Sequence, residues 1–154
     1  MPARDDVPVT LAPLGSADRA RWQELAEGYK TFYATAVDHA GYERAWQRLL
    51  NDDGVHVLGA RLDGTLAGIA HYFFHAGVWS SDVCHLQDLF VDPAVRGRGI
   101  ARALIAGVAD AARARNAPRL YWHTRADNAT ARALYDKVAR HDGFIRYDIA
   151  LAAP

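Results

Sequence analysis

The chain has 154 residues, of which 51% are hydrophobic and 23% charged, and its basic and acidic side chains balance to a net charge of zero. This length suits a single domain spanning residues 1–154, and no apolar run approaches the ~20 residues that a membrane-spanning helix needs. One cysteine excludes an internal disulfide framework and a cysteine-rich metal site, and a pI near 7.1 argues against a general nucleic-acid-binding protein.

The first part of the chain is predicted to form a strand and two helices. Its opening residues lack the apolar core of a secretory signal, which predicts a cytoplasmic protein. Alternating apolar residues predict a strand over 7–14, and Ser16 offers the N-cap of a helix that continues to about Ala36. A second helix is predicted over residues 42–50, where it ends before an Asn-Asp-Asp-Gly turn.

Three antiparallel strands are predicted next. Residues 56–75 contain two strand-like runs separated by Asp63 and Gly64, a dipeptide typical of a tight hairpin. Residues 84–91 form the third run. Its first residue, Cys84, is predicted to be a small buried strand residue.

Helices and strands alternate in the second part of the chain. Apolar residues three and four apart predict a helix over 99–116, followed by a strand over 119–124. Another helix is predicted to begin at Asn128, and a final strand covers 143–151. The elements together predict an α/β fold with a mixed, mostly antiparallel central sheet flanked by helices.

The turn between the strand at 84–91 and the helix at 99–116 is rich in arginine and glycine. A helix that begins at such a turn presents unpaired N–H groups at the positive end of its dipole, and glycine lets a ligand approach the backbone. Arginine side chains add charge-assisted contacts. The sequence therefore predicts a phosphate or pyrophosphate site, made by Arg96, Gly97, Arg98, Gly99, Ile100 and Ala101.

Other phosphate-binding turns fit this segment less well. A dinucleotide-binding turn would place Arg102 where close packing of helix and strand requires glycine or alanine. The phosphate loop of nucleotide hydrolases ends in Gly-Lys-Ser/Thr, which is missing here. An arginine–glycine tail that binds nucleic acid would be longer and would lie outside periodic structure.

The same turn resembles the acyl-CoA-binding motif of the GNAT superfamily of N-acetyltransferases. That motif reads Arg or Gln, two residues of any type, Gly, any residue, then Gly or Ala, and its fixed positions match Arg96, Gly99 and Ala101. The resemblance implies a GNAT fold in one N-acetyltransferase domain that uses acetyl-CoA. It also implies that the coenzyme A pyrophosphate binds the backbone amides of the turn and that the preceding strand, at Leu89, Phe90 and Val91, contacts the cofactor.

Residues 127–144 resemble a second motif of the same superfamily. The resemblance implies that Asn128 meets the pantetheine arm, with Ala131 beside it, and that Tyr135 lies near the thioester sulfur as a candidate general acid. From the residues alone, Asn128 could equally be a helix N-cap and Tyr135 a core aromatic two turns later. The two motifs in succession favour the functional interpretation.

Residues 67–75 and 85–92, with the loop at Trp79, are similar to the polyamine and thialysine acetyltransferase branch. This similarity implies acetyl transfer to the primary amine of a small cationic acceptor, such as a polyamine or a lysine analogue, with a protein or peptide lysine as an alternative. That branch has Leu-Glu-Asp where this chain has Leu-Gln-Asp, and the amide of Gln87 cannot accept a proton. The candidate acceptor-binding residues are Tyr33, Trp79, His85, Gln87 and Asp88.

An alkyl amine must lose a proton before it attacks a thioester, because its pKa is about 10.4. The candidate proton acceptors are Asp88, as the catalytic residue beside Tyr135, and His85. The scattered histidines show no ligand spacing, so no metal site is predicted.

The sequence leaves other functions open. The glutamine at position 87 is compatible with an acyl-CoA-binding sensor or regulatory module that has no turnover. The predicted partner is a small-molecule amine, with no nucleic acid and no membrane. The resemblance also implies a homodimer, although the sequence does not identify an interface.

Overall fold

The computed structural model describes residues 8–152 and divides the chain into two compact units. The first unit ends at His123 and contains the sheet. The second begins at Thr124 and contains one helix, α4 (Ala129–Val138). Within residues 8–152, every helix is too short or too polar to cross a membrane.

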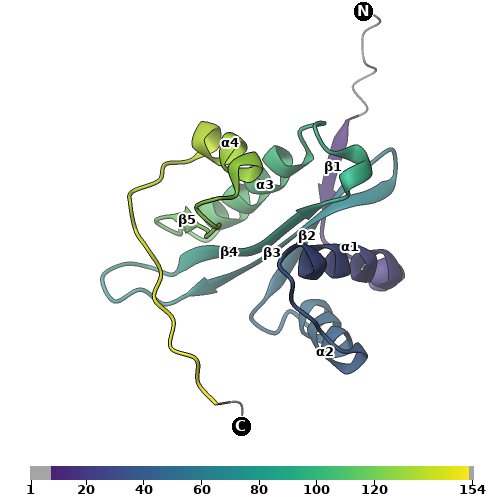
Figure 1. The fold of residues 1–154 in the computed structure, drawn as a ribbon, viewed down its shortest axis with the longest axis horizontal. Coiled ribbons are helices and arrows are strands. Elements are labelled where there is room, and N and C mark those ends of the chain that lie inside the picture. Colours follow the sequence, from purple (N-terminus) through teal and green to yellow (C-terminus); the bar gives the residue numbers. More distant parts are fainter. Residues whose placement is uncertain (1–7, 153–154) are drawn as a thin grey trace, which may run out of the picture. The chain divides into compact units, whose positions relative to one another are not determined.

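The first unit is built on a five-stranded sheet whose strands follow one another in chain order (Figure 1). Neighbouring strands are antiparallel from the first to the fourth, and the last pair is parallel. This arrangement confirms the predicted mixed, mostly antiparallel sheet. The strands are β1 (Val9–Ala12), β2 (His56–Leu62), β3 (Thr65–His75), β4 (Val83–Val91) and β5 (Leu120–Tyr121).

Helices cover both faces of this sheet (Figure 1). The helices α1 (Arg19–Phe32) and α2 (His39–Leu50) lie on one face, and α3 (Ile100–Ala114) lies on the other. Two short 3₁₀ turns, η1 (Ser16–Asp18) and η2 (Pro93–Val95), precede α1 and α3.

The bounds of the first two helices differ from the prediction for local reasons. Ser16 is not the N-cap of α1, because Asp18 Oδ2 accepts a hydrogen bond from the Gly15 N–H at 2.9 Å and a 3₁₀ turn forms first. The helix also stops before Ala36, since Ala34 has a left-handed φ of +52°. The second helix starts earlier than predicted because the Asp38 side chain accepts from the Gly41 N–H at 2.7 Å.

Close packing of α3 against β3 fixes where the arginine–glycine turn lies. A side chain at Gly68 would place its Cβ 3.0 Å from Ile100 and 3.1 Å from Leu104, so these side chains would have to shift to accommodate it. Leu104 and Val108 are fully buried in this contact. The N-terminus of α3 is therefore held directly beyond the end of β4.

The other face of the sheet has an aromatic core. Trp22 of α1 and Trp46 of α2 are both buried, with their ring centroids 5.1 Å apart. Cys84 of β4 is fully buried, which confirms the sequence prediction, and burial raises the pKa of its thiol to about 11. The thiol is therefore protonated and unreactive in the folded protein.

Two predicted strands differ from the structure. The strand predicted over 119–124 is formed only at Leu120 and Tyr121. The one predicted over 143–151 is wrong as a description of the structure, because these residues belong to neither helix nor strand and are exposed. Alternating apolar residues identify a segment that is able to pair, but a strand also needs a neighbour with a free edge.

Candidate functional site

The turn that leads into α3 is open on the side of its glycines. Gly97 and Gly99 have φ angles of +78° and +77°, and no atom lies within 4 Å of where a Cβ would stand at either position. The first intrahelical bond runs from the Ala103 N–H to the Gly99 carbonyl, at 2.9 Å. The preceding N–H groups of this fifteen-residue helix are thus at its positive end, where the backbone can hold an anion.

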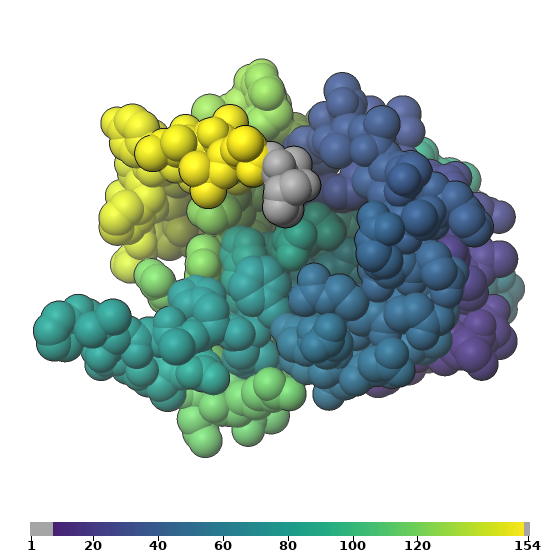
Figure 2. Space-filling model, turned by 90° about the horizontal axis from the view of Figure 1, so that it is seen from below, coloured from purple at the N-terminus to yellow at the C-terminus, as the bar shows by residue number. Residues whose placement is uncertain are grey.

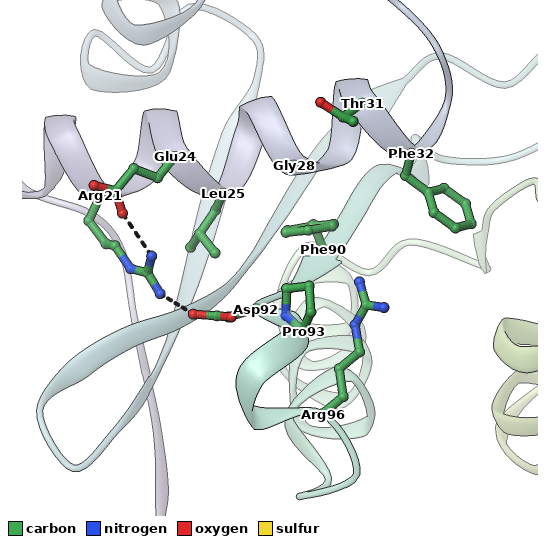
Figure 3. Close-up of a pocket in the computed structure, with 10 residues that line it drawn as sticks. All are labelled: Arg21, Glu24, Leu25, Gly28, Thr31, Phe32, Phe90, Asp92, Pro93 and Arg96. Atoms are coloured by element: carbon green, nitrogen blue, oxygen red, sulfur yellow. Dashed lines mark hydrogen bonds and ion pairs between the residues drawn. The ribbon is translucent and has the colours of Figure 1, made fainter.

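The side chain of Arg96 points away from this turn and toward α1 (Figure 3). Its Nε donates to the Val91 carbonyl at 3.2 Å, and its guanidinium lies 5.5 Å from the centroid of the Phe90 ring. Arg96 and Phe90 line a pocket of about 420 Å³ between α1 and the end of β4. Arg96 thus contacts the end of β4 and lines this pocket together with residues of α1.

Arg21 of α1 bonds residues at the end of β4 beside the same pocket. Its guanidinium bonds Asp92 at 2.5 Å and Glu24 at 2.8 Å, as Figure 3 shows, and its Nε donates to the Leu66 carbonyl at 3.0 Å. Gly28 completes the contact, because a Cβ there would lie 2.6 Å from Phe90. The sequence analysis did not single out Arg21, Glu24, Gly28 or Asp92.

A hydrogen-bonded chain runs from α1 to Asp88 of β4. The Trp22 indole N–H donates to His71 Nε2 at 2.9 Å, and His71 Nδ1 lies 2.8 Å from Asp88 Oδ2. Because indole can only donate, Nε2 must carry the lone pair and Nδ1 the proton. His71 is therefore neutral and donates to the Asp88 carboxylate.

This chain holds Asp88 in its ionised form. Burial raises the pKa of Asp88, but the hydrogen bond from His71, the hydrogen bond from Tyr29 and the charge of Lys30 outweigh it, so the pKa lies below its ordinary value. The side chains of His71 and Asp88 are each 15% exposed. The site thus offers a carboxylate that is ionised at neutral pH and partly open to solvent.

A bulge in β4 sets the position of Asp88. His71 of β3 pairs with Asp88, whereas the next residue, Tyr72, pairs with Leu86, so Gln87 is the extra residue. Gln87 is exposed, and with Asp88 it lines a pocket of about 140 Å³ that also includes residues of α2.

The second half of β4 has a free edge in the described sheet. The parallel ladder between β4 and β5 covers only Cys84 and His85. The strand edge from Leu86 to Val91 is therefore available to a ligand that extends toward the turn. The predicted contact residues Leu89, Phe90 and Val91 lie along this stretch.

His85 lies in a cluster of aromatic side chains at the other end of β4. Its ring centroid is 4.6 Å from that of Tyr121 and 5.4 Å from that of His123. Burial and the neighbouring His123 lower the pKa of His85, so its ring is neutral at neutral pH. Its Nδ1 is buried without a hydrogen-bond partner among the described residues.

The structure brings together some of the predicted acceptor-binding residues and separates others. Tyr33 stacks on Tyr29 with ring centroids 4.7 Å apart, and Tyr29 in turn bonds Asp88. Trp79 is 96% exposed in the loop between β3 and β4, and Figure 2 shows this loop projecting beyond the helices of the first unit. The structure therefore does not bring Trp79 into the cluster around Asp88.

In the second unit, Asn128 is the N-cap of α4. Its side chain accepts from the Ala131 N–H at 3.5 Å and donates to Thr124 Oγ1 at 3.0 Å. Tyr135 follows two turns later and is half-buried. Asn128 is thus a helix N-cap, the role that the sequence alone allowed. Its side-chain oxygen accepts one hydrogen bond here and can accept a second from a ligand.

The residues that the sequence analysis missed are those that act on Asp88 from other elements. Trp22, Tyr29 and His71 belong to α1 and β3, and only the strand register places His71 opposite Asp88. A histidine in a neighbouring strand could have indicated a partner for a candidate carboxylate. The bulge, however, shifts the register by one residue, so the sequence alone does not show that His71 lies opposite Asp88. Among the described residues, no group of three histidine, cysteine or acidic side chains could hold a metal ion.

Comparison with known proteins gives a consistent result. The model of the acetyltransferase (GNAT) family matches residues 22–139. A D-amino-acid N-acetyltransferase of Saccharomyces cerevisiae is 32% identical over 136 residues, which cover 85% of this chain and 84% of the relative. A thialysine N-epsilon-acetyltransferase of Caenorhabditis elegans is 32% identical over 89 residues, which cover 58% of this chain and 56% of the relative.

Solved structures share the fold. A ribosomal-protein-alanine N-acetyltransferase from Brucella melitensis biovar Abortus is similar, with a TM-score of 0.75 and 26% identity, over 94% of this chain and 100% of that one.

Proposed function

The chain belongs to the GNAT family of acetyltransferases and is an acetyl-CoA-dependent N-acetyltransferase, and we propose that its acceptor is the primary amine of a small cationic molecule. The ionised Asp88, held by His71 beside an aromatic surface, is the observation that carries this proposal. A carboxylate in this setting attracts an ammonium group, and the aromatic rings suit an alkyl stem. Residues 1–154 act in this proposal as one N-acetyltransferase domain.

The turn and the free edge of β4 are the proposed binding surface for acetyl-CoA, which supplies an acetyl group activated as a thioester. The open glycines at 97 and 99 allow the amides from Arg96 to Ala101 to approach the pyrophosphate. Arg98 adds positive charge beside them. The edge of β4 from Leu89 to Val91 then accepts and donates hydrogen bonds along the extended arm.

Asp88 is the proposed acceptor of the proton that the amine releases. It is ionised at neutral pH and, because its pKa is low, returns the proton quickly to water. His71 and Trp22 hold the carboxylate in one orientation and do not themselves exchange a proton. Gln87 and His85, on the same strand, are the further proposed contacts of the acceptor.

A second acceptor class is the α-amine of an amino acid or a peptide. The low pKa of Asp88 favours this acceptor class, because it makes the carboxylate a weak base. Gln87 cannot supply a second base, since its amide does not accept a proton. An α-amine has a pKa of about 7.7–8.0, so about one-tenth is neutral at pH 7, against about one in two thousand for an alkyl amine. The yeast relative is named for D-amino acids, and the Brucella relative for a protein alanine. The worm relative is named for thialysine, but its match covers little more than half of either chain.

A panel of acceptors tests the proposal by thiol release from acetyl-CoA. Polyamines, lysine analogues, amino acids of both configurations and short peptides are compared by kcat/KM, with a disulfide reagent reporting free coenzyme A. The buried Cys84, with its thiol pKa of about 11, adds no background in the folded protein. We expect small cationic amines to give the highest kcat/KM. If amino acids or peptides give a higher kcat/KM than every small cationic amine, the acceptor is an α-amine instead.

Tyr135 is the proposed general acid for the departing thiolate. We expect Tyr135→Phe to lower kcat about 10-fold and to leave the acetyl-CoA Kd within twofold. The effect is modest because a thiol with a pKa of about 8.5 leaves without full protonation. Tyr42→Phe removes a phenol from the core of α2 and should leave kcat unchanged. An unchanged kcat in Tyr135→Phe would assign Tyr135 to packing.

A further inference from the structure

The pocket of about 140 Å³ beside Asp88 contains a second charged side chain, Arg48 of α2. Ala45, Arg48 and Leu49 all line the pocket, and their spacing of three and four residues puts them on one face of α2. The pocket is small compared with the range of about 300–1,000 Å³ that is typical of ligand pockets. It therefore fits a molecule of few atoms, with a carboxylate on β4 and a guanidinium on α2.

The aromatic core that orients Asp88 also positions Arg48. Trp22 donates to His71, which donates to Asp88, and the same indole packs against Trp46 of α2 with ring centroids 5.1 Å apart. Because both tryptophans are buried, they hold α2 in a fixed position relative to this hydrogen-bonded chain. The Arg48 side chain thus begins from a fixed backbone at the edge of the pocket.

Arg48 keeps hydrogen-bond donors for a ligand. Its Nε lies 3.6 Å from Asp53 Oδ2, and its Nη2 donates to the Asp53 carbonyl at 3.4 Å. Both distances are long for hydrogen bonds, and the ion pair is weak because the two side chains are 56% and 72% exposed. Among the residues that the structure describes, no ion pair joins Arg48 to Asp88. Each of the two charges is therefore able to bind an opposite charge on a ligand.

We propose that Arg48 binds a carboxylate of the acceptor while Asp88 binds its ammonium group, so that the acceptor is an amine that also carries a carboxylate. A guanidinium can form a bidentate pair with a carboxylate, which fixes the direction in which the molecule lies. The amide of Gln87 lines the same pocket and can donate to the carboxylate as well. The inference rests on the proposed acetyl transfer at Asp88 and narrows it, because amino acids and lysine analogues carry both groups and polyamines carry no carboxylate.

Pairs of acceptors that differ only in the carboxylate test this assignment. Glycine, β-alanine, γ-aminobutyrate and lysine are compared with methylamine, ethylamine, propylamine and cadaverine by kcat/KM at saturating acetyl-CoA. We expect at least one acid to be preferred over its amine. Arg48→Gln should reduce that preference about 10- to 100-fold, the contribution of a charge-assisted hydrogen bond, by raising KM for the acid and leaving kcat unchanged. Arg48→Lys keeps the charge and should recover part of the preference.

Two controls show whether the effect belongs to the pocket. Arg44→Gln removes the same charge one turn earlier on α2, where the side chain does not line the pocket, and should leave the preference unchanged. Asp53→Asn removes the weak partner of Arg48 and should also preserve it. If no acid is preferred by the wild-type chain, or if Arg48→Gln keeps the full preference, the inference is overturned while acetyl transfer to amines stands.

Binding without turnover separates this inference from the proposed function. Calorimetry at saturating coenzyme A gives the Kd of lysine and of cadaverine, whether or not any acceptor releases thiol. We expect lysine to bind the wild-type chain more tightly than cadaverine, and Arg48→Gln to bind the two equally. This result without thiol release would overturn the proposed function and still support Arg48 as the residue that binds a carboxylate. Equal Kd values in the wild-type chain overturn the inference.

Discussion

Asp88→Asn is expected to lower kcat/KM for the amine by at least about 100-fold, at the lower end of the range of about 10²–10⁴ for proton-transfer groups. The amide has nearly the shape of the carboxylate and still accepts the hydrogen bond from His71, so the site should keep its geometry. It carries no charge and takes no proton, so the ammonium form is neither attracted nor neutralised. Initial rates at saturating acetyl-CoA measure the loss.

Asp18→Asn is the matched control for this substitution. Like Asp88, Asp18 has a side chain that is 15% exposed. Its partner is Arg61 at 2.6 Å, whereas the partner of Asp88 is His71. It lies before α1 and bonds Arg61 of β2, and it is not among the groups that act on Asp88. Turnover should therefore be unchanged in Asp18→Asn, and equal losses in both variants would show that the Asp88 effect is structural.

The same carboxylate links stability to pH. The pKa of Asp88 is lowered in the folded protein, so its ionised form stabilises the fold above the unfolded value of about 3.9. This contribution is lost as the pH falls through the lowered folded value. The free energy of unfolding of the wild-type chain should therefore fall relative to Asp88→Asn as the solution is acidified below about pH 4.

The sequence predicts those features whose signals are local. Asp63 and Gly64 fix a hairpin by their own turn preference, and the spacing of apolar residues identifies α3 without knowledge of what it packs on. The glycine at 99 marks the start of that helix because its left-handed φ is a local requirement. The phosphate-binding turn is predictable for the same reason.

Features that depend on register or on a distant partner are not predictable in this way. The bulge at Gln87 decides which residue of β3 meets Asp88, and nothing in either strand alone specifies it. His71 becomes a partner of Asp88 only through that register. The segment 143–151 has the alternation of a strand, but the pattern does not supply the neighbouring strand edge that pairing needs.

Gly99→Gln is expected to weaken acetyl-CoA binding at least about 100-fold, measured by calorimetry. The turn holds Gly99 at a φ of +77°, with nothing within 4 Å of its Cβ position, so a longer side chain would extend from the open side of the turn, where we propose that the cofactor approaches the amides of α3. The left-handed conformation also costs about 1–2 kcal/mol of stability for a residue with a side chain.

Gly64→Gln separates the two effects. Gly64 has the same φ of +77° and the same open surroundings, but it lies in the hairpin between β2 and β3. Both variants should lose a similar amount of unfolding free energy in urea, and only Gly99→Gln should lose acetyl-CoA affinity. If the two variants bind acetyl-CoA equally well, the open turn at α3 is not the site where the backbone holds the cofactor, and the binding surface must be sought on the free edge of β4.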